Sequence, residues 1–563
     1  MSEEASVGKM PVRAMVSRFL ILLAAAGLAG FGGTKIGMDS NQATACAVFI
    51  SIIFGTLFFW GFRLAIAFLG LAVLIFNKSL DIPTFVGSSS LEVIMFLVGM
   101  MVIVGALRDL GFFTWIVQLI VSMPNLNAKK FIFVTATASA LLACAVDEVT
   151  SIIFISTLIF QVSDRLKLNA TPYILIAVLA TNIGSSGTMM GNPVGIFIGT
   201  KGSLTFGDFM LWAFPVMLVS LFIVTALLLV YFRKDLAKFD ENLKARLARG
   251  LSIAPVVDVP YMRGLILIVL TVLAIASHHQ TEELLGLQKN SVLLVMPLIC
   301  AGIVMIIKPE RARYYIEKEV DWWTLIFFML LFAVAGTLEH TGVDQVLARG
   351  FAKIAGTSTE SLVPFIFTVS AFGSAFVDNV IFVAAFSPVI EQLSVNIKDL
   401  PLWWALLFGA CFGGNITMIG STANIVALGM LEKHGGSQIT FFQWFKIGLL
   451  CTAVSGGIAV TTLLVLNPYM ADHKITFEKL HHKSGYVPHA SEFDGELSGT
   501  IVREGAKCYL RNDGGGRILL NLPDGMVEKV GRVKVSGIFC KAASEAEYPW
   551  QLNVTKLEEI KTH

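Results

Sequence analysis

The stretch from Thr181 to Gly199 constrains the fold of this chain more than any other. It is apolar enough to lie in a lipid bilayer, yet five glycines and Pro193 interrupt it. A helix broken in this way exposes backbone amides and carbonyls, which hydrocarbon tolerates only where they are buried in protein or line a watery cavity. The stretch therefore predicts a membrane helix that is broken around an ion or solute site.

A second stretch, from Cys411 to Leu428, repeats the core of the first. The sequence Thr-Met-Met-Gly at 188–191 is matched by Thr-Met-Ile-Gly at 417–420. An Asp-Glu-Val sequence at 147–149 is likewise matched by Asp-Asn-Val at 378–380. We expect two related units, and because the first should start outside the membrane and the second inside, they should be inverted copies.

Composition places the chain among polytopic membrane proteins, with the lipid bilayer as its first partner. Hydrophobic residues make up 55% of the 563 positions and charged residues 15%. Many apolar runs approach the ~20 residues that a spanning helix needs. A net charge of +2 argues against a nucleic-acid partner, which usually requires a strong basic excess.

The predicted fold class is an all-α polytopic membrane protein with inverted repeats, two re-entrant hairpins, two broken helices and about 11 transmembrane helices, followed by a small C-terminal all-β domain of OB type. Hairpins are predicted at 131–161 and 362–393, because each pairs short apolar arms that meet at acidic residues. The regions expected are N-terminal scaffold helices, a first repeat, a cytoplasmic linker with connecting helices, a second repeat and the β domain, at 1–90, 91–232, 233–320, 321–468 and 469–563.

Charge patterning predicts the orientation. Lysines and arginines cluster in the connections 233–263 and 308–318, and short cytoplasmic loops carry an excess of these residues. Both connections should therefore be cytoplasmic, as should the N-terminus, and an odd number of spans places the C-terminal domain outside. We expect an integral protein of a bacterial inner membrane.

Three acidic residues, Asp147, Glu148 and Asp378, lie at the bends of the predicted hairpins. Ionised carboxylates are costly within a membrane, so they usually face a cavity, pair with another group, or bind a cation or proton. The alternative is that they cap the half-helices that start beside them, since Asp is a favoured N-cap. The sequence leaves both roles open.

The broken helices add hydroxyl and amide side chains, which together with freed carbonyls suit a hard cation such as Na⁺. Alternatively, each Ser or Thr bonds back to its own helix. The predicted substrate- and ion-binding residues are Asp147, Glu148, Asn182, Ser185, Thr188, Asn192, Asp378, Asn379, Asn415, Thr417, Ser421, Thr422 and Asn424. The candidate Na⁺ ligands among them are Asp147, Asn192, Asp378 and Asn424. No resident cofactor and no catalytic residue are expected.

The paired motifs resemble a known superfamily of ion transporters. Asp-Asn at 378–379, Gly-Gly-Asn at 413–415 and Asn424, with their echo in the first unit, are similar to motifs of arsenite permeases, NhaD-type sodium–proton antiporters, melanosomal P protein and citrate transporter-like permeases. The resemblance covers about residues 45–468. It implies a homodimer in which a mobile transport domain moves against a static scaffold by an elevator movement.

In the first unit the chain departs from the superfamily pattern. Glu148 stands where an Asn is common, and Gly-Asn-Pro-Val-Gly at 191–195 stands where Gly-Asp-Pro-Pro-Asn is common. By resemblance, the hairpin tips at 147–150 and 378–380 and the broken helices would hold the ion and substrate.

Two functions fit these features. The first is transport of a small anion or oxyacid, carboxylate or arsenite-like, coupled to Na⁺ or H⁺. The second is Na⁺/H⁺ antiport without an organic substrate. No Lys or Arg lies in the hairpin arms or the breaks, so an anion would depend on half-helix dipoles and a co-bound cation. An enzyme would need a nucleophile–base pair or a metal cluster, and neither is evident.

The tail beyond Asn467 changes character. Alternating runs at 507–510, 517–522, 532–539 and 551–557, with turn signals between them, predict the β domain. Their spacing resembles an OB barrel, for which balanced charge favours a structural or docking role over nucleic-acid binding. Whether Cys508 and Cys540 pair is left open.

Overall fold

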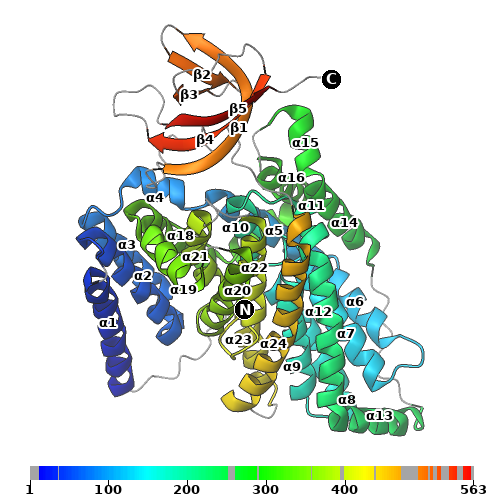
Figure 1. The fold of residues 1–563 in the computed structure, drawn as a ribbon. Coiled ribbons are helices and arrows are strands. Elements are labelled where there is room, and N and C mark those ends of the chain that lie inside the picture. Colours follow the sequence, from blue (N-terminus) through cyan, green and yellow to red (C-terminus); the bar gives the residue numbers. More distant parts are fainter. Residues whose placement is uncertain are drawn as a thin grey trace.

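The structure is a computed structural model that describes residues 12–35, 37–250, 260–287, 291–356, 358–393, 399–435 and 439–470, and the backbone of five strands between 492 and 559. The described residues up to 470 form helices and short connections, without a strand. Figure 1 shows α4 (Ile82–Ser88), α11 (Phe206–Asp208) and α15 (His278–Leu285) at one end of this helical body and α13 (Arg233–Leu247) at the other.

The first three long helices pack in sequence order. α1 (Val12–Lys35) packs against α2 (Ser40–Phe58), and α2 packs against α3 (Arg63–Phe76). α2 starts at a capping box, in which Asp39 accepts the Gln42 amide at 2.8 Å and the Gln42 side chain accepts the Asp39 amide at 3.0 Å. Such a box satisfies amides that the first helical turn cannot use, so it fixes where α2 begins.

The first unit, residues 91–232, runs from a long buried helix through a helical hairpin and a broken helix to a final long helix. Its elements are α5 (Leu91–Asp109), α6 (Phe112–Val121), α7 (Ala128–Ala145), α8 (Glu148–Leu166), α9 (Thr171–Gly184), α10 (Pro193–Lys201), α11, a π-helical turn (Phe209–Ala213) and α12 (Phe214–Tyr231). α7 and α8 form the hairpin, and residues 185–192 separate the two halves of the broken helix.

The second unit, residues 321–468, has the same order of elements. They are α18 (Trp322–Thr341), α19 (Val343–Ala355), α20 (Thr359–Phe376), α21 (Asn379–Leu393), α22 (Asp399–Gly413), α23 (Thr422–Lys433) and α24 (Phe441–Leu466). α20 and α21 form the hairpin, and residues 414–421 separate α22 from α23. Between the units lie α13, α14 (Met262–Ala276), α15, α16 (Ser291–Ile307), α17 (Pro309–Tyr314) and a second π-helical turn (Tyr315–Glu319).

The number of membrane helices corrects the predicted fold class. Among the described residues, nine helices are long and apolar enough to cross a membrane, or ten if α14 and α15, bent by 53°, form one span. The prediction of about 11 is wrong. Three of the nine are the hairpin helices α7, α8 and α20. The sequence had predicted that these arms of the hairpins would be too short to cross a membrane. They are longer because polar residues extend them beyond the apolar runs, as Lys129 does in α7 and Arg165 in α8.

Each broken helix lies directly against its hairpin, at a glycine. A Cβ on Gly184 of α9 would lie 2.4 Å from the Ala140 Cα of α7, and a Cβ on Gly413 of α22 would lie 2.4 Å from the Ala371 Cα of α20. No side chain larger than hydrogen fits at that separation. The two glycines therefore set how closely the break approaches the hairpin, in the same way in both units.

Helix α13 joins the ends of three helices of the first unit. Polar side chains make these bonds: Ala128 N donates to Asp240 Oδ1 at 2.7 Å, Asn242 Nδ2 to Leu166 O at 2.8 Å, and Tyr173 Oη to Asp235 O at 3.1 Å. The first two satisfy a helix N-terminus and a helix C-terminus that would otherwise lack partners. α13 is thus fastened to α7, α8 and α9 together.

The C-terminal strands are described by their backbone. β1 (Glu492–Glu504), β2 (Lys507–Arg511), β3 (Arg517–Asn521), β4 (Arg532–Lys541) and β5 (Trp550–Glu559) pair in the order β1-β2-β3-β5-β4, closing on β1. β1 was not predicted. The side chains here, including those of Cys508 and Cys540, lie outside the described residues. All residues with described side chains belong to the helical body, so the fold class is restricted to that body and the OB-type domain is withdrawn from it.

Candidate ion and solute site

Both helix breaks are closed by a polar residue that caps the second half-helix. Asn192 accepts the Gly195 amide at 2.9 Å where α10 begins. Ser421 accepts the Ala423 amide at 3.1 Å where α23 begins. Pro193 contributes in the first unit, because it lacks an amide proton and its fixed φ suits the first helical position. These caps fix where each second half-helix begins, and so fix the length of the polar segment between the two half-helices.

The threonine of the repeated core ties each break to its hairpin. The Thr188 hydroxyl donates to the Cys144 carbonyl, and the Thr417 hydroxyl donates to the Ala375 carbonyl. Each hydroxyl also accepts an amide two residues on, at 3.2 Å from Met190 and 3.3 Å from Ile419. These threonines were predicted to bind the ion or substrate. In the structure their hydroxyls hold the hairpin ends, where C-terminal carbonyls lack helical partners, and their binding role stays a prediction.

Three asparagines connect the two units at their centre. Asn182 Nδ2 donates to Asn415 Oδ1 and to Asn424 Oδ1, both at 2.8 Å. Asn424 Nδ2 donates in turn to Gly414 O at 2.7 Å and Thr417 O at 2.9 Å. The three side chains are at most 1% exposed. Asn182 Oδ1 is buried, and the described residues give it no hydrogen-bond partner.

Glu148 brings a carboxylate from the first hairpin to the second break. Ser421 Oγ donates to its Oε1 at 3.4 Å, and Asn192 and Ser185 lie beside the same carboxylate. Glu148 is 5% exposed, and its Oε2 is buried without a hydrogen-bond partner among the described residues. An unpaired buried carboxylate oxygen is costly, and a bound cation or proton would remove much of that cost.

The two hairpin aspartates act as caps. Asp147 accepts the Thr150 amide at 2.7 Å, and Asp378 accepts the Val380 amide at 3.0 Å. Asp378 also accepts the Thr422 hydroxyl at 3.0 Å, so it connects the hairpin tip to α23. Both aspartates therefore cap the helices that begin beside them, as the alternative reading of the sequence expected. Asp378 also lies beside the second break, because it accepts the Thr422 hydroxyl.

Most of the predicted residues come together in one buried cluster, which we call the central cluster. Its members are Glu148, Asn182, Ser185, Asn192, Asp378, Asn415, Ser421, Thr422 and Asn424. Outside it, Thr188 and Thr417 tie the breaks to the hairpins, Asp147 is half-buried at its cap, and Asn379 is buried at the start of α21.

Sequence reasoning missed two residues near the central cluster. Cys411 accepts a hydrogen bond from Asn192 Nδ2 at 3.4 Å. It precedes Thr417 by the same number of positions as Asn182 precedes Thr188, a correspondence that could have identified it. Arg63, at the start of α3, is 5% exposed and interacts electrostatically with Asp378. No motif in the sequence connects Arg63 to the repeated units.

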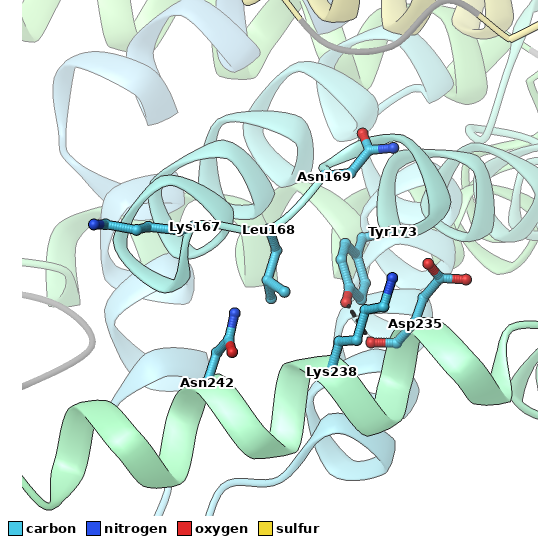
Figure 2. Close-up of a pocket in the computed structure, with 7 residues that line it drawn as sticks. All are labelled: Lys167, Leu168, Asn169, Tyr173, Asp235, Lys238 and Asn242. Carbon is cyan, nitrogen blue, oxygen red and sulfur yellow. Dashed lines mark hydrogen bonds between the residues drawn. The ribbon is translucent and has the colours of Figure 1, made fainter.

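A surface pocket of about 240 Å³ lies away from the central cluster, between α13 and the start of α9. Figure 2 shows its lining residues: Lys167, Leu168, Asn169, Tyr173, Asp235, Lys238 and Asn242. The dashed bond runs from the Tyr173 hydroxyl to the Asp235 backbone carbonyl. No residue predicted to bind ion or substrate lines this pocket. We interpret it as a gap left where α13 packs against the start of α9.

Comparisons of the sequence with known proteins give matches over most of the chain. A family model described as a citrate transporter, CitMHS, matches residues 50–409 and 283–487. An uncharacterized transporter of Mycobacterium bovis is 32% identical over 385 residues, covering 66% of this chain and 85% of the relative. The P protein of Mus musculus is 26% identical over 447 residues, covering 66% of this chain and 53% of the relative. The crystal structure of the Alcanivorax borkumensis YdaH transporter gives a TM-score of 0.48 at 17% identity, covering 71% of this chain and 89% of that one.

Proposed function

Since this chain belongs to the CitMHS citrate transporter family, whose members are membrane transporters and not enzymes, we propose that it is a secondary active transporter moving a small anion or oxyacid together with Na⁺ or H⁺. Family membership also confirms the superfamily resemblance seen in the paired motifs. Carboxylates are the first solutes to test, because citrate is named in the description of the family.

Two buried oxygens carry this proposal. Glu148 Oε2 and Asn182 Oδ1 both lie in the central cluster without a hydrogen-bond partner among the described residues. Leaving a buried acceptor unpaired costs about 1–3 kcal/mol, and more for a charged group. Carboxylate and amide oxygens are ligands that hard cations accept. A Na⁺ ion or a proton taken up here would offset that cost, which favours a coupling ion as part of the bound state.

The anion would be held beside the cation. The N-terminal ends of α10 and α23 meet the central cluster at Asn192 and Ser421, and helix N-termini favour negative groups. Neither break contains Lys or Arg, and those of the hairpin helices, Lys129, Lys130 and Arg165, lie at the ends of α7 and α8 that are remote from the hairpin tip. The bound cation would therefore supply the positive charge that the anion needs, so that the two bind cooperatively.

The wider arrangement is part of the same proposal. The hairpins and broken helices would move as a transport domain against α1–α3 and their neighbours, in a homodimer, by the elevator movement that the resemblance implies. The connections containing α13 and α17 would face the cytoplasm, since both are rich in Lys and Arg.

The test is uptake into proteoliposomes under separately imposed Na⁺ and pH gradients, with radiolabelled citrate, a dicarboxylate and arsenite as candidate solutes. We expect gradient-driven uptake of at least one solute, and loss of gradient dependence in Glu148→Gln. Ser186→Ala is the matched control, because the Ser186 hydroxyl donates to the Ile183 carbonyl of its own helix. Normal coupling in Glu148→Gln would contradict the proposed ion site.

Na⁺/H⁺ antiport without an organic solute is the second candidate, favoured by the absence of Lys and Arg from the breaks and the hairpin tips. It predicts that an imposed Na⁺ gradient alone changes the pH inside vesicles, which a trapped pH-sensitive dye reports. Exchange in the absence of any added solute, combined with no uptake of the tested anions, would favour the antiporter over the symporter.

A further inference from the structure

Basic side chains gather at the base of the first hairpin, where α7 begins and α8 ends. α13 carries five Lys or Arg against three Asp or Glu, and Lys129, Arg165 and Lys167 lie at the helix ends beside it. This end of the helical body is opposite the end with α4, α11 and α15 (Figure 1). The central cluster does not use these charges, so their function lies elsewhere.

α13 lies at the level where membrane helices end. α7, α8 and α12 are long and apolar enough to span a membrane, and α13 follows α12 with only Phe232 between them. Asp240 holds α13 to the Ala128 amide at the start of α7, and Asn242 holds it to the Leu166 carbonyl at the end of α8. α13 therefore runs across the ends of these helices, at the level of the lipid headgroups.

α13 is apolar on the side that faces the protein and basic on the sides that do not. Its buried residues are Leu236, Phe239 and Leu243, at a spacing that places them on one side of a helix. Arg233 and Lys244 are exposed. A helix with an apolar side and exposed basic residues is typical of helices that lie in the membrane interface.

A hollow of about 430 Å³ lies between α13 and the start of α7. It is on the opposite side of α13 from the pocket in Figure 2, because positions 240, 243, 244 and 247 line the hollow and positions 235, 238 and 242 line the pocket. Lys129 and Lys244 bring two ammonium groups to it, and Leu126 and Leu247 bring apolar surface. The hollow thus combines positive charge with a surface that an acyl chain can cover.

The two lysines of the hollow are not neutralised by the acid beside them. Asp240 also lines the hollow, but its Oδ1 accepts the Ala128 amide at 2.7 Å, at the positive end of the α7 dipole. The neighbouring Lys130 is engaged elsewhere, since its Nζ donates to the Pro124 carbonyl at 2.8 Å. Lys129 and Lys244 therefore supply the positive charge of the hollow.

We propose that this hollow binds the headgroup of an anionic phospholipid, with Lys129 and Lys244 on the phosphate and an acyl chain along Leu126 and Leu247. Charge selects the anionic lipid, because a zwitterionic headgroup brings a cation of its own to the two lysines. The leucines select a lipid over free phosphate, which has no apolar part. The bound lipid would tie α13, and with it the base of the first hairpin, to the headgroup layer.

The experiment uses the full chain, purified in a non-ionic detergent and freed of lipid. Dioleoyl phosphatidylglycerol, dioleoyl phosphatidylcholine and inorganic phosphate are added separately, and the unfolding temperature is measured against the amount added. We expect phosphatidylglycerol to raise it, and the other two to have little effect. For Lys129→Gln and Lys244→Gln, the half-saturating mole fraction of phosphatidylglycerol should rise about fivefold each. Lys130→Gln is the control, because the Lys130 ammonium bonds the Pro124 carbonyl.

Equal stabilisation by the two lipids would overturn the inference, as would wild-type dependence on phosphatidylglycerol in the variant with both lysines replaced. A loss as large in Lys130→Gln would show a general effect of surface charge and would also contradict the site. Inorganic phosphate that stabilises as well as phosphatidylglycerol would assign the hollow to free phosphate. Leu247→Ser separates these sources, because it should weaken the effect of the lipid alone; Leu247 is 53% exposed, so the packed interior is kept.

Discussion

Asn182 and Asn424 lie 242 residues apart in the sequence, and the Asn182 amide donates to Asn424 Oδ1 at 2.8 Å. The bond joins the end of α9 to the first turn of α23 and so crosses between the units. Asn182 holds Asn415 by the same amide group. One side chain thus holds Asn415 of the second break and Asn424 of α23.

Replacing this side chain tests its importance. Asn182→Ala leaves the buried Oδ1 atoms of Asn415 and Asn424 without this donor, so we expect a loss of about 1–3 kcal/mol of stability and a higher half-saturating concentration of the coupling ion. Thermal unfolding in detergent and ion-dependent uptake measure the two effects. Ser186→Ala, four residues on in the same break, should change neither. Wild-type ion dependence in Asn182→Ala would remove Asn182 from the site.

The paired threonines should behave alike. Thr188→Val and Thr417→Val each delete a hydroxyl that donates to a hairpin carbonyl, and we expect each to cost about 1–2 kcal/mol of stability. The measurement is the unfolding temperature in detergent. Thr200→Val is the control, because its hydroxyl bonds only carbonyls of its own helix, Ile196 and Phe197. A large effect in one unit and none in the other would contradict equivalent ties.

Glycine at the hairpin contacts should be irreplaceable. Gly184→Ala and Gly413→Ala each place a Cβ 2.4 Å from the Cα of the facing hairpin helix. Overpacking of this kind costs about 1–3 kcal/mol or more, so we expect reduced yield of folded protein on size-exclusion chromatography. Gly457→Ala, where a Cβ meets nothing within 4 Å, should express normally. Wild-type yield of both hairpin variants would show that the helices separate easily.

The buried carboxyl of Asp344 should make the stability of the folded protein depend on pH. It lies in α19, is 2% exposed, and burial raises its pKa to about 7, with Glu339 and Glu391 adding to the effect. Lys201, which Glu391 and Glu339 attract, is the cation of this group. A carboxyl with a raised pKa binds a proton in the folded state, so its favourable contribution is present at low pH and is lost as pH rises through 7.

Asp344→Asn removes that dependence. We expect the variant to gain roughly 2–4 kcal/mol over wild type above pH 7, and the difference to vanish near pH 4. Unfolding temperatures between pH 4 and 8.5 measure the difference. The exposed residue Glu360 provides a control in Glu360→Gln, for which no such trend is expected. A constant difference across this pH range would contradict a titrating Asp344.

The sequence predicted those features of the fold that depend on neighbouring residues along the chain. Glycines recur within both stretches, and Pro193 adds to them in the first, so both breaks were visible at Thr181–Gly199 and Cys411–Leu428. The number of spans was not, because the length of a helix does not follow from its apolar run: polar residues lengthen α7 and α8 to the length of a span, whereas α3 and α16 fall short of it. α7 and α8 show this at Lys129 and Arg165.

The contacts of the central cluster lay beyond sequence reasoning for a different reason. Residue types and repeats indicate which side chains are polar and near a break, but not which of them meet across units. That Thr188 bonds a hairpin carbonyl while Asn182 bonds two asparagines depends on packing. Arg63 was missed because its hydrogen-bond partner, Thr324, lies far along the chain.

The attachment of α13 has a practical consequence. Two of its side chains cap the ends of α7 and α8, and its Asp235 backbone carbonyl accepts the Tyr173 hydroxyl of α9. We therefore expect this amphipathic helix to move together with the first hairpin. A fluorophore at exposed Glu241 of α13 would therefore test whether the first hairpin moves when a solute is added, without a label near the central cluster.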